Sequence, residues 1–261
     1  MKPLSNILPR LRYDRISWVL FIILVAAFWM SAINNKKHSF PNDIRIEVEP
    51  LENGLKLITE RDVKQALFLA FGNTLMSTEL HRLEVGRIES VLEDDPFVRQ
   101  SDAWIDRNNI LHVRIRQRRP ILRILDKEGE NYYIDAQGAM MPPSRNFTAH
   151  VLVATGAIGP YVRDFREKKN SPLRDVFELA QYILADDFLA SLCQQIHVNN
   201  MGDIELVPLL GKQKIILGNT RNLDDKFGRL KTFYREAMPY AGWQTYKIIN
   251  LKFNGQIVCR K

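Results

Sequence analysis

Residues 101–116 read SDAWIDRNNILHVRIR, and this stretch decides the fold because it predicts a tight β-hairpin. Every second residue from 101 to 105, and again from 111 to 115, is small or apolar. Asn108 and Asn109 lie between the two runs, and asparagine tolerates the left-handed backbone that such a turn requires. The pattern predicts two antiparallel strands that bury one common face.

A strand and two helices are predicted upstream of this hairpin. Residues 44–48 alternate apolar and charged side chains, which is typical of a strand with one buried face. A first helix is expected to begin at Thr59, whose hydroxyl can cap it, and to end at Gly72. A second helix is expected from Leu83 to Glu93. The order strand–helix–helix–strand–strand predicts a small α+β domain over residues 43–119, with helices on one face of its sheet.

Beyond this domain the pattern changes to short strands, and residues 120–261 are expected to form a mixed β domain with flanking helices. Helices are expected at 172–184, where Pro172 occupies the first turn, and at 224–237. Asn254-Gly255 predicts a hairpin turn between the last two strands. The expected strands are 121–125, 132–135, 140–141, 151–154, 195–198, 204–207, 214–217, 245–253 and 256–260.

Residues 16–33 (ISWVLFIILVAAFWMSAI) predict one transmembrane helix, because no charge interrupts them and a span needs about 17–25 residues. Trp18 and Trp29 lie near its two ends, where aromatic rings prefer the membrane interface. A cleaved signal peptide is the alternative, but the residues after the apolar run make a poor cleavage site. Residues 1–15 hold four basic residues and one acid, which predicts a cytoplasmic tail and an exported C-terminal part beyond a linker at 34–42.

The formal charge of the chain is +7, and a basic balance can attract nucleic acid, anionic lipid or an acidic protein. An exported domain seldom meets nucleic acid, so the other two are favoured. Arg114 and Arg116 belong to the densest basic run, which is either a solvated strand face or a docking surface on the hairpin. Cys193 and Cys259 form no disulfide framework and no zinc pattern, so they are either paired or inert thiols.

No catalytic or metal-binding motif is recognisable in the sequence. None of the five histidines has HExxH spacing, and neither a GxSxG elbow nor a phosphate-binding loop is present. The acidic run at 93–95 precedes Pro96 at a helix end, where a solvated terminus is more common than a catalytic pair. We therefore expect a binding protein, not an enzyme, with no cofactor, no metal and no small-molecule substrate.

Several segments in this order resemble the FtsQ/DivIB family of cell-division proteins. Gly72–Leu75 (GNTL) resembles the link between the two helices of the family's POTRA domain, and Tyr133–Gly138 (YIDAQG) resembles the turn that opens its β domain. The other matching segments are 88–98 (IESVLEDDPFV), 110–120 (ILHVRIRQRRP), and Leu217-Gly218 followed by a helix with Lys226 and a closing hairpin. The resemblance covers about residues 15–260.

This resemblance implies a scaffold of the division machinery, held in the inner membrane at the division septum. It would link early and late division proteins and bind small bitopic coiled-coil partners similar to FtsB and FtsL. Such a partner would add a strand to the last strand, Gln256–Arg260, unless that strand is already paired on both sides. The candidate partner-binding residues are Phe253, Asn254, Gly255, Gln256, Ile257 and Val258.

Two other classes of function are alternatives. POTRA domains also occur in envelope-assembly factors, although those chains carry a β-barrel or several POTRA repeats. An anchored extracytoplasmic hydrolase is a further alternative, because active sites assemble in space and need no sequence motif.

Overall fold

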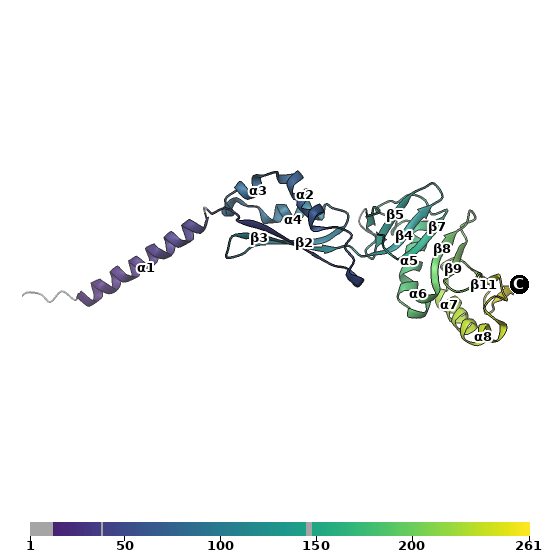
Figure 1. Ribbon diagram of the computed structural model, residues 1–261. Coiled ribbons are helices and arrows are strands. Elements are labelled where there is room, and N and C mark those ends of the chain that lie inside the picture. The colour runs from purple at the N-terminus through teal and green to yellow at the C-terminus, as the bar shows by residue number, and fades with distance from the viewer. Residues whose placement is uncertain (1–12, 38, 145–147) are drawn as a thin grey trace, which may run out of the picture. The chain divides into compact units, whose positions relative to one another are not determined.

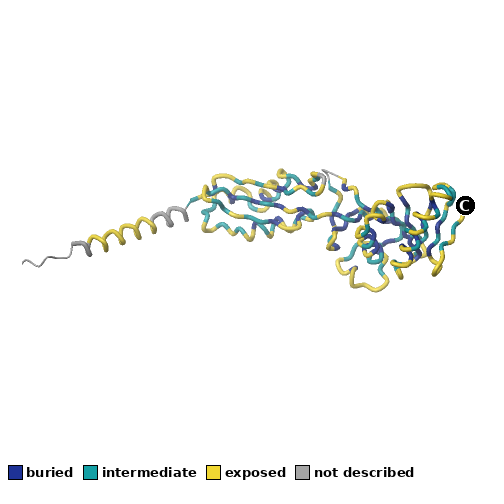
Figure 2. The backbone as a smooth tube through the Cα atoms, turned by 90° about the horizontal axis from the view of Figure 1, so that it is seen from below, coloured by how far each residue is buried: buried dark blue, intermediate teal, exposed yellow. Residues whose placement is uncertain are grey.

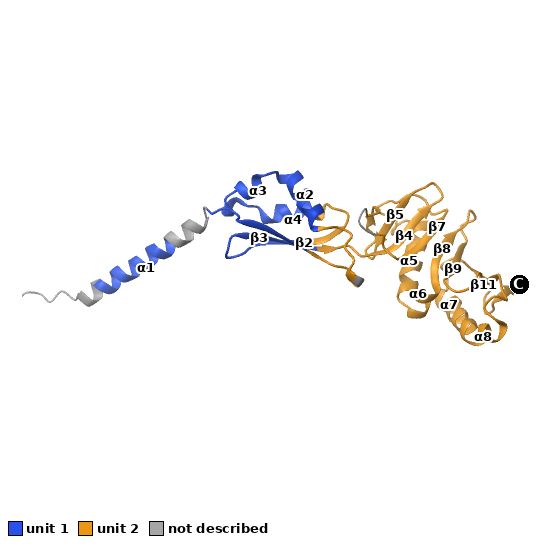
Figure 3. Cartoon of the chain, viewed as in Figure 1, with its two compact units in different colours: residues 1–47, 60–92, 101–115 blue, residues 48–59, 93–100, 116–261 orange. Residues whose placement is uncertain are grey.

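The computed structural model describes residues 13–37, 39–144 and 148–261, and the chain divides into two compact units (Figure 3). The fold is α+β, as predicted. Of the expected cytoplasmic tail, residues 1–15, the first twelve lie outside the described residues. Unit 1 comprises Met1–Glu47, Glu60–Leu92 and Ser101–Ile115, and unit 2 comprises Val48–Thr59, Glu93–Gln100 and Arg116–Lys261.

Helix α1 runs from Tyr13 to Lys37, so it contains the expected span 16–33 and continues into the expected linker (Figure 1). The large apolar side chains between Trp18 and Met30 are exposed. Within the described part of the chain, no helix combines the length and the apolarity that crossing a membrane requires.

A three-stranded sheet confirms the hairpin that the sequence predicts. Its strands are β1 (Asp43–Glu49), β2 (Val98–Ile105) and β3 (Ile110–Gln117), in the order β1-β3-β2. Asn109 has a φ of 61° in the turn between β2 and β3. Every second residue of β3, from Leu111 to Gln117, is buried, so one face of the strand is covered.

Three helices accompany this sheet. They are α2 (Glu60–Phe71), α3 (Thr74–Ser77) and α4 (Val85–Glu93), with 3-10 turns η1 (Glu52–Gly54) and η2 (Leu80–Arg82). α2 buries Val63 and Leu67, and α4 buries Ile88 and Leu92. The spacing of four residues in each pair gives one apolar face per helix, which explains why both were predictable. α3 was not predicted, because four residues are too few to show a period.

Gln117 attaches the segment after β1 to the end of β3, within unit 2. Its side-chain oxygen accepts hydrogen bonds from the amides of Leu57 (2.6 Å) and Ile58 (3.2 Å). Its side-chain amide donates to the carbonyl oxygen of Glu49 at 2.7 Å. Gln117 is buried, so it satisfies backbone groups that would otherwise lose their hydrogen bonds to water.

A nine-stranded sheet forms the centre of unit 2, in the order β12-β11-β10-β9-β8-β7-β4-β5-β6. Three of its neighbouring pairs are parallel, namely β4 with β7, β7 with β8, and β10 with β11. The strands are β4 (Pro120–Asp126), β5 (Asn131–Asp135), β6 (Met140–Met141), β7 (Leu152–Gly156), β8 (Cys193–Val198), β9 (Ile204–Pro208), β10 (Lys214–Gly218), β11 (Ile248–Asn250) and β12 (Val258–Arg260).

Helices pack on this sheet and enclose the main core, in which the tube of Figure 2 is largely dark blue. α5 (Pro172–Leu184) has the predicted bounds, with Ser171 as its N-cap. α6 (Asp187–Leu192) follows, and Asp186 accepts a hydrogen bond from the amide of Leu189 at 3.1 Å as its N-cap. α7 (Leu223–Thr232) continues through a π-helical turn, η3 (Phe233–Ala237), into α8 (Met238–Ala241).

Gly156 at the end of β7 has a φ of 99°, and a Cβ placed there would lie 2.1 Å from the carbonyl oxygen of Val198. We expect Gly156→Ala to destabilise the fold through backbone strain of about 1–3 kcal/mol, to which the clash adds about 1–3 kcal/mol. Gly129→Ala is the matched control, because Gly129 has a φ of 93° with nothing within 4 Å of its Cβ position. Urea unfolding measures both losses, and equal losses would contradict the clash.

Candidate protein-binding edge

β12 is the terminal strand of the nine-stranded sheet. Among the strands that the structure describes, β11 alone pairs with it, through Ile249 opposite Cys259 and the residues on either side. In an antiparallel pair, every second residue directs its amide and carbonyl away from the neighbouring strand. The outer side of β12 therefore offers unpaired backbone groups, which another strand can bind.

The candidate residues 253–258 form a turn, a short connection and the first residue of β12. Gly255 has a φ of 69° in this turn, as an Asn-Gly turn requires. The expected strand 256–260 is wrong at its start, because β12 begins at Val258. The expected strand 245–253 is also too long, since only Ile248–Asn250 form β11.

The side chains at this edge divide between the core and the solvent. Phe253 and Val258 are 48% and 44% exposed. Ile257 and Cys259 are partly buried and pack instead against the main core. Cys259 and Cys193 are both free thiols, and burial raises the pKa of each, for Cys193 to about 12.

Arg229 of α7 holds the connection that leads into β12. Its guanidinium donates hydrogen bonds to the carbonyl oxygen of Gln256 and, at 3.4 Å, to that of Leu251. It also forms an ion pair with Asp225, with 2.7 Å between Nη2 and Oδ2. The Arg229 side chain is 14% exposed, and hydrogen bonds from a charged donor are stronger than neutral ones. α7 therefore fixes the point at which the edge strand begins.

Lys226, one turn earlier on α7, holds the end of β10. Its ammonium donates to the carbonyl oxygens of Leu217 (3.0 Å) and Asn219 (2.8 Å), and to the side-chain oxygen of Asn219 (3.0 Å). Lys226 is buried, and this burial lowers the pKa of its ammonium. The helix thus carries two cations, three residues apart, that satisfy backbone carbonyls of the outer strands and their loops.

A groove of about 530 Å³ lies beside the edge, between α7 and the connection to β12. Asp224, which lines this groove, accepts a hydrogen bond at 2.6 Å from the hydroxyl of Tyr182 on α5. That bond raises the pKa of Tyr182 to about 12. The groove is lined by Asp224, Asp225, Gly228, Arg229, Thr232, Phe233, Gly255, Gln256 and Ile257. The edge and the groove share Gly255–Ile257, so one partner can contact both.

Arg114 and Arg116, the second predicted docking surface, lie on β3, the central strand of the smaller sheet. Arg114 lies 3.3 Å from Glu47 and stacks over the ring of Trp104 at 5.2 Å. The Nε of Arg116 lies 3.7 Å from Glu49. Both side chains are partly exposed, so a docking partner would compete with these ion pairs.

Sequence reasoning did not identify Arg229 or Asp225 as part of the site. Their spacing of four residues is visible in the sequence and predicts a helix ion pair. The contact between Arg229 and the carbonyl of Gln256 spans 27 positions in the sequence, so only the folded chain reveals it.

Residues 119–260, which include all nine strands of the larger sheet, match the sequence profile of the family described as "FtsQ/DivIB, C-terminal related". The chain is also similar to the cell division protein FtsQ of Rhodothermus marinus, with 25% identity over 170 residues. That stretch is 64% of this chain and 61% of the relative, so the chain spans less than two thirds of the relative's length.

Removing the Arg229 side chain should loosen the edge. We expect Arg229→Ala to speed amide exchange at residues 257–260 and to lower the free energy of unfolding by about 1.5–3 kcal/mol, the range for a hydrogen bond to a charged group. Arg235→Ala is the control, because Arg235 is 73% exposed and lies 3.9 Å from Glu236. Hydrogen exchange measured by mass spectrometry tests the effect. Unchanged exchange at residues 257–260 in Arg229→Ala would show that Arg229 does not fix the edge strand.

Proposed function

The chain belongs to the FtsQ/DivIB C-terminal related family, and from this membership we propose that it is a non-enzymatic scaffold of the cell-division machinery. A role in cell division follows from the family. In our proposal the protein binds small bitopic coiled-coil division proteins similar to FtsB and FtsL. It thereby links early and late division proteins during septum formation.

The observation that carries this proposal is the open edge of the nine-stranded sheet at β12. A partner strand that pairs with β12 would satisfy the backbone groups on its outer side, and the main-chain hydrogen bonds would give affinity. Phe253 and Val258, both exposed, would supply side-chain contacts. We assign the partner site to residues 253–258, together with Arg229, which positions them.

We further propose that α1 anchors the protein in the inner membrane through residues 16–33. The uncharged sequence of this segment and the exposed apolar side chains from Trp18 to Met30 support an anchor. The basic residues before it favour a cytoplasmic N-terminus and a periplasmic C-terminal part. In this arrangement residues 43–119 act as a POTRA-like domain and residues 120–261 as the partner-binding β domain.

Arg114 and Arg116 are a proposed second docking surface for another division protein. The support is the stack of Arg114 on Trp104, since arginine and tryptophan are both enriched among the residues that dominate binding energy at interfaces. Charge reversal at both arginines should weaken one interaction of the division complex while binding through β12 persists.

A proline at β12 should abolish partner binding. Asn250 of β11 faces Val258 through its backbone groups, so the amide of β12 that points outward is that of Cys259. Cys259→Pro removes this donor from the open edge, so we expect pull-down of the coiled-coil partners to be lost. Met140→Pro is the matched control, since Met140 lies in β6 at the opposite edge and is 42% exposed. Val258→Asp, which keeps the amide, should also lose binding while its melting temperature stays unchanged. Folded Cys259→Pro or Val258→Asp protein that still binds would show that the site lies elsewhere.

Depletion of the protein in cells tests the scaffold role itself. A fluorescent protein fused to the N-terminus should form a band at the division site, and depletion of the native chain should leave cells unseparated. An even membrane distribution together with normal division would reject the proposal.

A further inference from the structure

An apolar tip of unit 1 remains uncovered, where α2 ends and α3 follows. Phe68 and Leu69 are 59% and 76% exposed at the end of α2, and Met76 of α3 is 41% exposed. The inward faces of these helices are already filled by other residues, such as the buried Leu67 and Leu75. Exposed apolar clusters of this kind mark interaction surfaces, because water contact with them is unfavourable.

The charge of this segment selects the surface that it can contact. Residues 63–78 (VKQALFLAFGNTLMST) contain one lysine and no acidic residue. Arg82, which follows the tip, is 71% exposed, although it also lies 3.4 Å from Glu79. The nearest acids lie outside this stretch, at Glu60, Asp62 and Glu79, so the apolar tip itself carries no negative charge and suits the interface of an anionic lipid bilayer.

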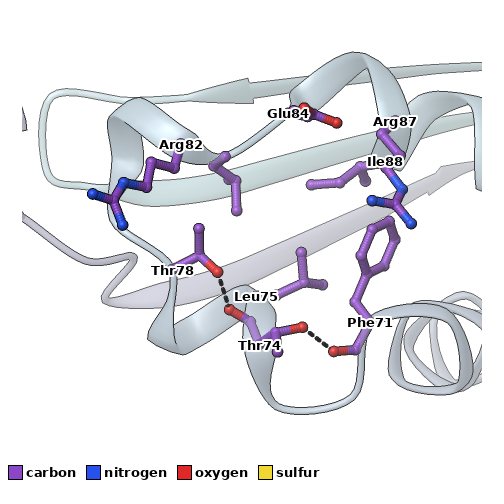
Figure 4. Close-up of a pocket in the computed structure, with 9 residues that line it drawn as sticks. Phe71, Thr74, Leu75, Thr78, Arg82, Glu84, Arg87 and Ile88 are labelled. Carbon is purple, nitrogen blue, oxygen red and sulfur yellow. Dashed lines mark hydrogen bonds between the residues drawn. The ribbon is translucent and has the colours of Figure 1, made fainter.

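Arg82 and Arg87 also stand on either side of a cavity of about 240 Å³ beside the tip (Figure 4). The buried side chains of Leu75 and Ile88 line this cavity, as does Glu84. Arginine side chains at a membrane surface bind lipid phosphate groups, so this basic pair lies where headgroups would meet the tip.

The chain connects this tip closely to the end of α1. The amide of Leu80 donates a hydrogen bond to the carbonyl oxygen of Ser39 at 2.9 Å, and Ser39 lies two positions after the last residue of α1, Lys37. An extended chain spans at most about 3.6 Å per residue, so Met76 lies within roughly 25 Å of the end of α1. If α1 is a membrane anchor, the bilayer surface is therefore always within reach of the tip.

We infer that the α2–α3 tip, formed by Phe68, Leu69 and Met76, rests in the headgroup region of the membrane that holds α1. This inference rests on the proposed anchor. The contact would restrain the helices α2 and α3 at the membrane surface, in addition to the covalent connection to α1 through residues 38–42.

Depth-dependent quenching tests this contact in the full chain. In a Cys259→Ser background, where the buried Cys193 does not react, a Leu69→Cys variant carries an environment-sensitive fluorophore. The protein is reconstituted into phosphatidylcholine–phosphatidylglycerol vesicles with and without nitroxide-labelled headgroups. The Leu69→Cys label should lose emission when the headgroups carry the nitroxide, as expected for a group in the headgroup region. Ser90→Cys, at an exposed position of α4, should lose little.

A label on Ala26→Cys within α1, quenched by a nitroxide on the acyl chains, distinguishes the tip contact from the membrane anchor. Quenching at residue 26 without quenching at residue 69 overturns the tip contact and leaves the anchor in place. No quenching at residue 26 overturns both. As a second measurement, a Met76→Cys label should lose its quenching when Phe68 and Leu69 are changed to serine, and unchanged quenching would show that the apolar side chains do not hold the tip.

Discussion

The edge of the larger sheet depends on two cations of α7 that bind backbone carbonyls. Buried carbonyl groups need hydrogen-bond partners, and Lys226 supplies one at the end of β10. Arg229 binds the carbonyl oxygen of Gln256, an exposed residue before β12. Because Gln256 is held by Arg229 and not by a neighbouring strand, the chain turns at Gly255 and pairs again only from Val258. The residues directly before β12, Gly255–Ile257, line the groove along α7.

The two ends of the nine-stranded sheet are built differently. At one end β6 has only two residues, and it follows a turn in which Asp135 accepts hydrogen bonds from the amides of Gln137 (2.9 Å) and Ala139 (2.8 Å). Asp135 is fully buried and pairs with Arg118 at 3.1 Å, so this end is fixed by a charged network. At the other end β12 carries exposed apolar side chains beside unpaired backbone. Short edges limit unwanted strand pairing, and β6 is the shorter of the two.

The sequence predicts those parts of the fold that depend on the local periodicity of apolar residues and on turn residues. The hairpin at 101–116, α5 with its first-turn proline and most strands of unit 2 follow from alternation and turn residues. The order of strands does not follow, because it depends on crossovers: β10 and β11 are parallel and α7 connects them. For the same reason the start of β12 was misplaced, since it is set by a side chain from another element. That 256–260 would contain an edge strand was predictable from the family resemblance and not from the local pattern.

The short length of β12 also limits how a partner can bind. Of its three residues only Cys259 directs its amide and carbonyl outward, so β12 can add about two backbone hydrogen bonds. At a net of about 0.5–1.5 kcal/mol each, these amount to roughly 1–3 kcal/mol in all. A Kd of about 1 mM corresponds to roughly 4 kcal/mol, so strand addition alone would give only weak binding. A stable complex therefore needs further contacts, and the surfaces next to β12 are Phe253, Val258 and the groove lined by Phe233 and Ile257. A partner whose strand continues into an apolar helix would fill that groove, which makes the groove along α7 as much a part of the proposed site as the edge strand itself.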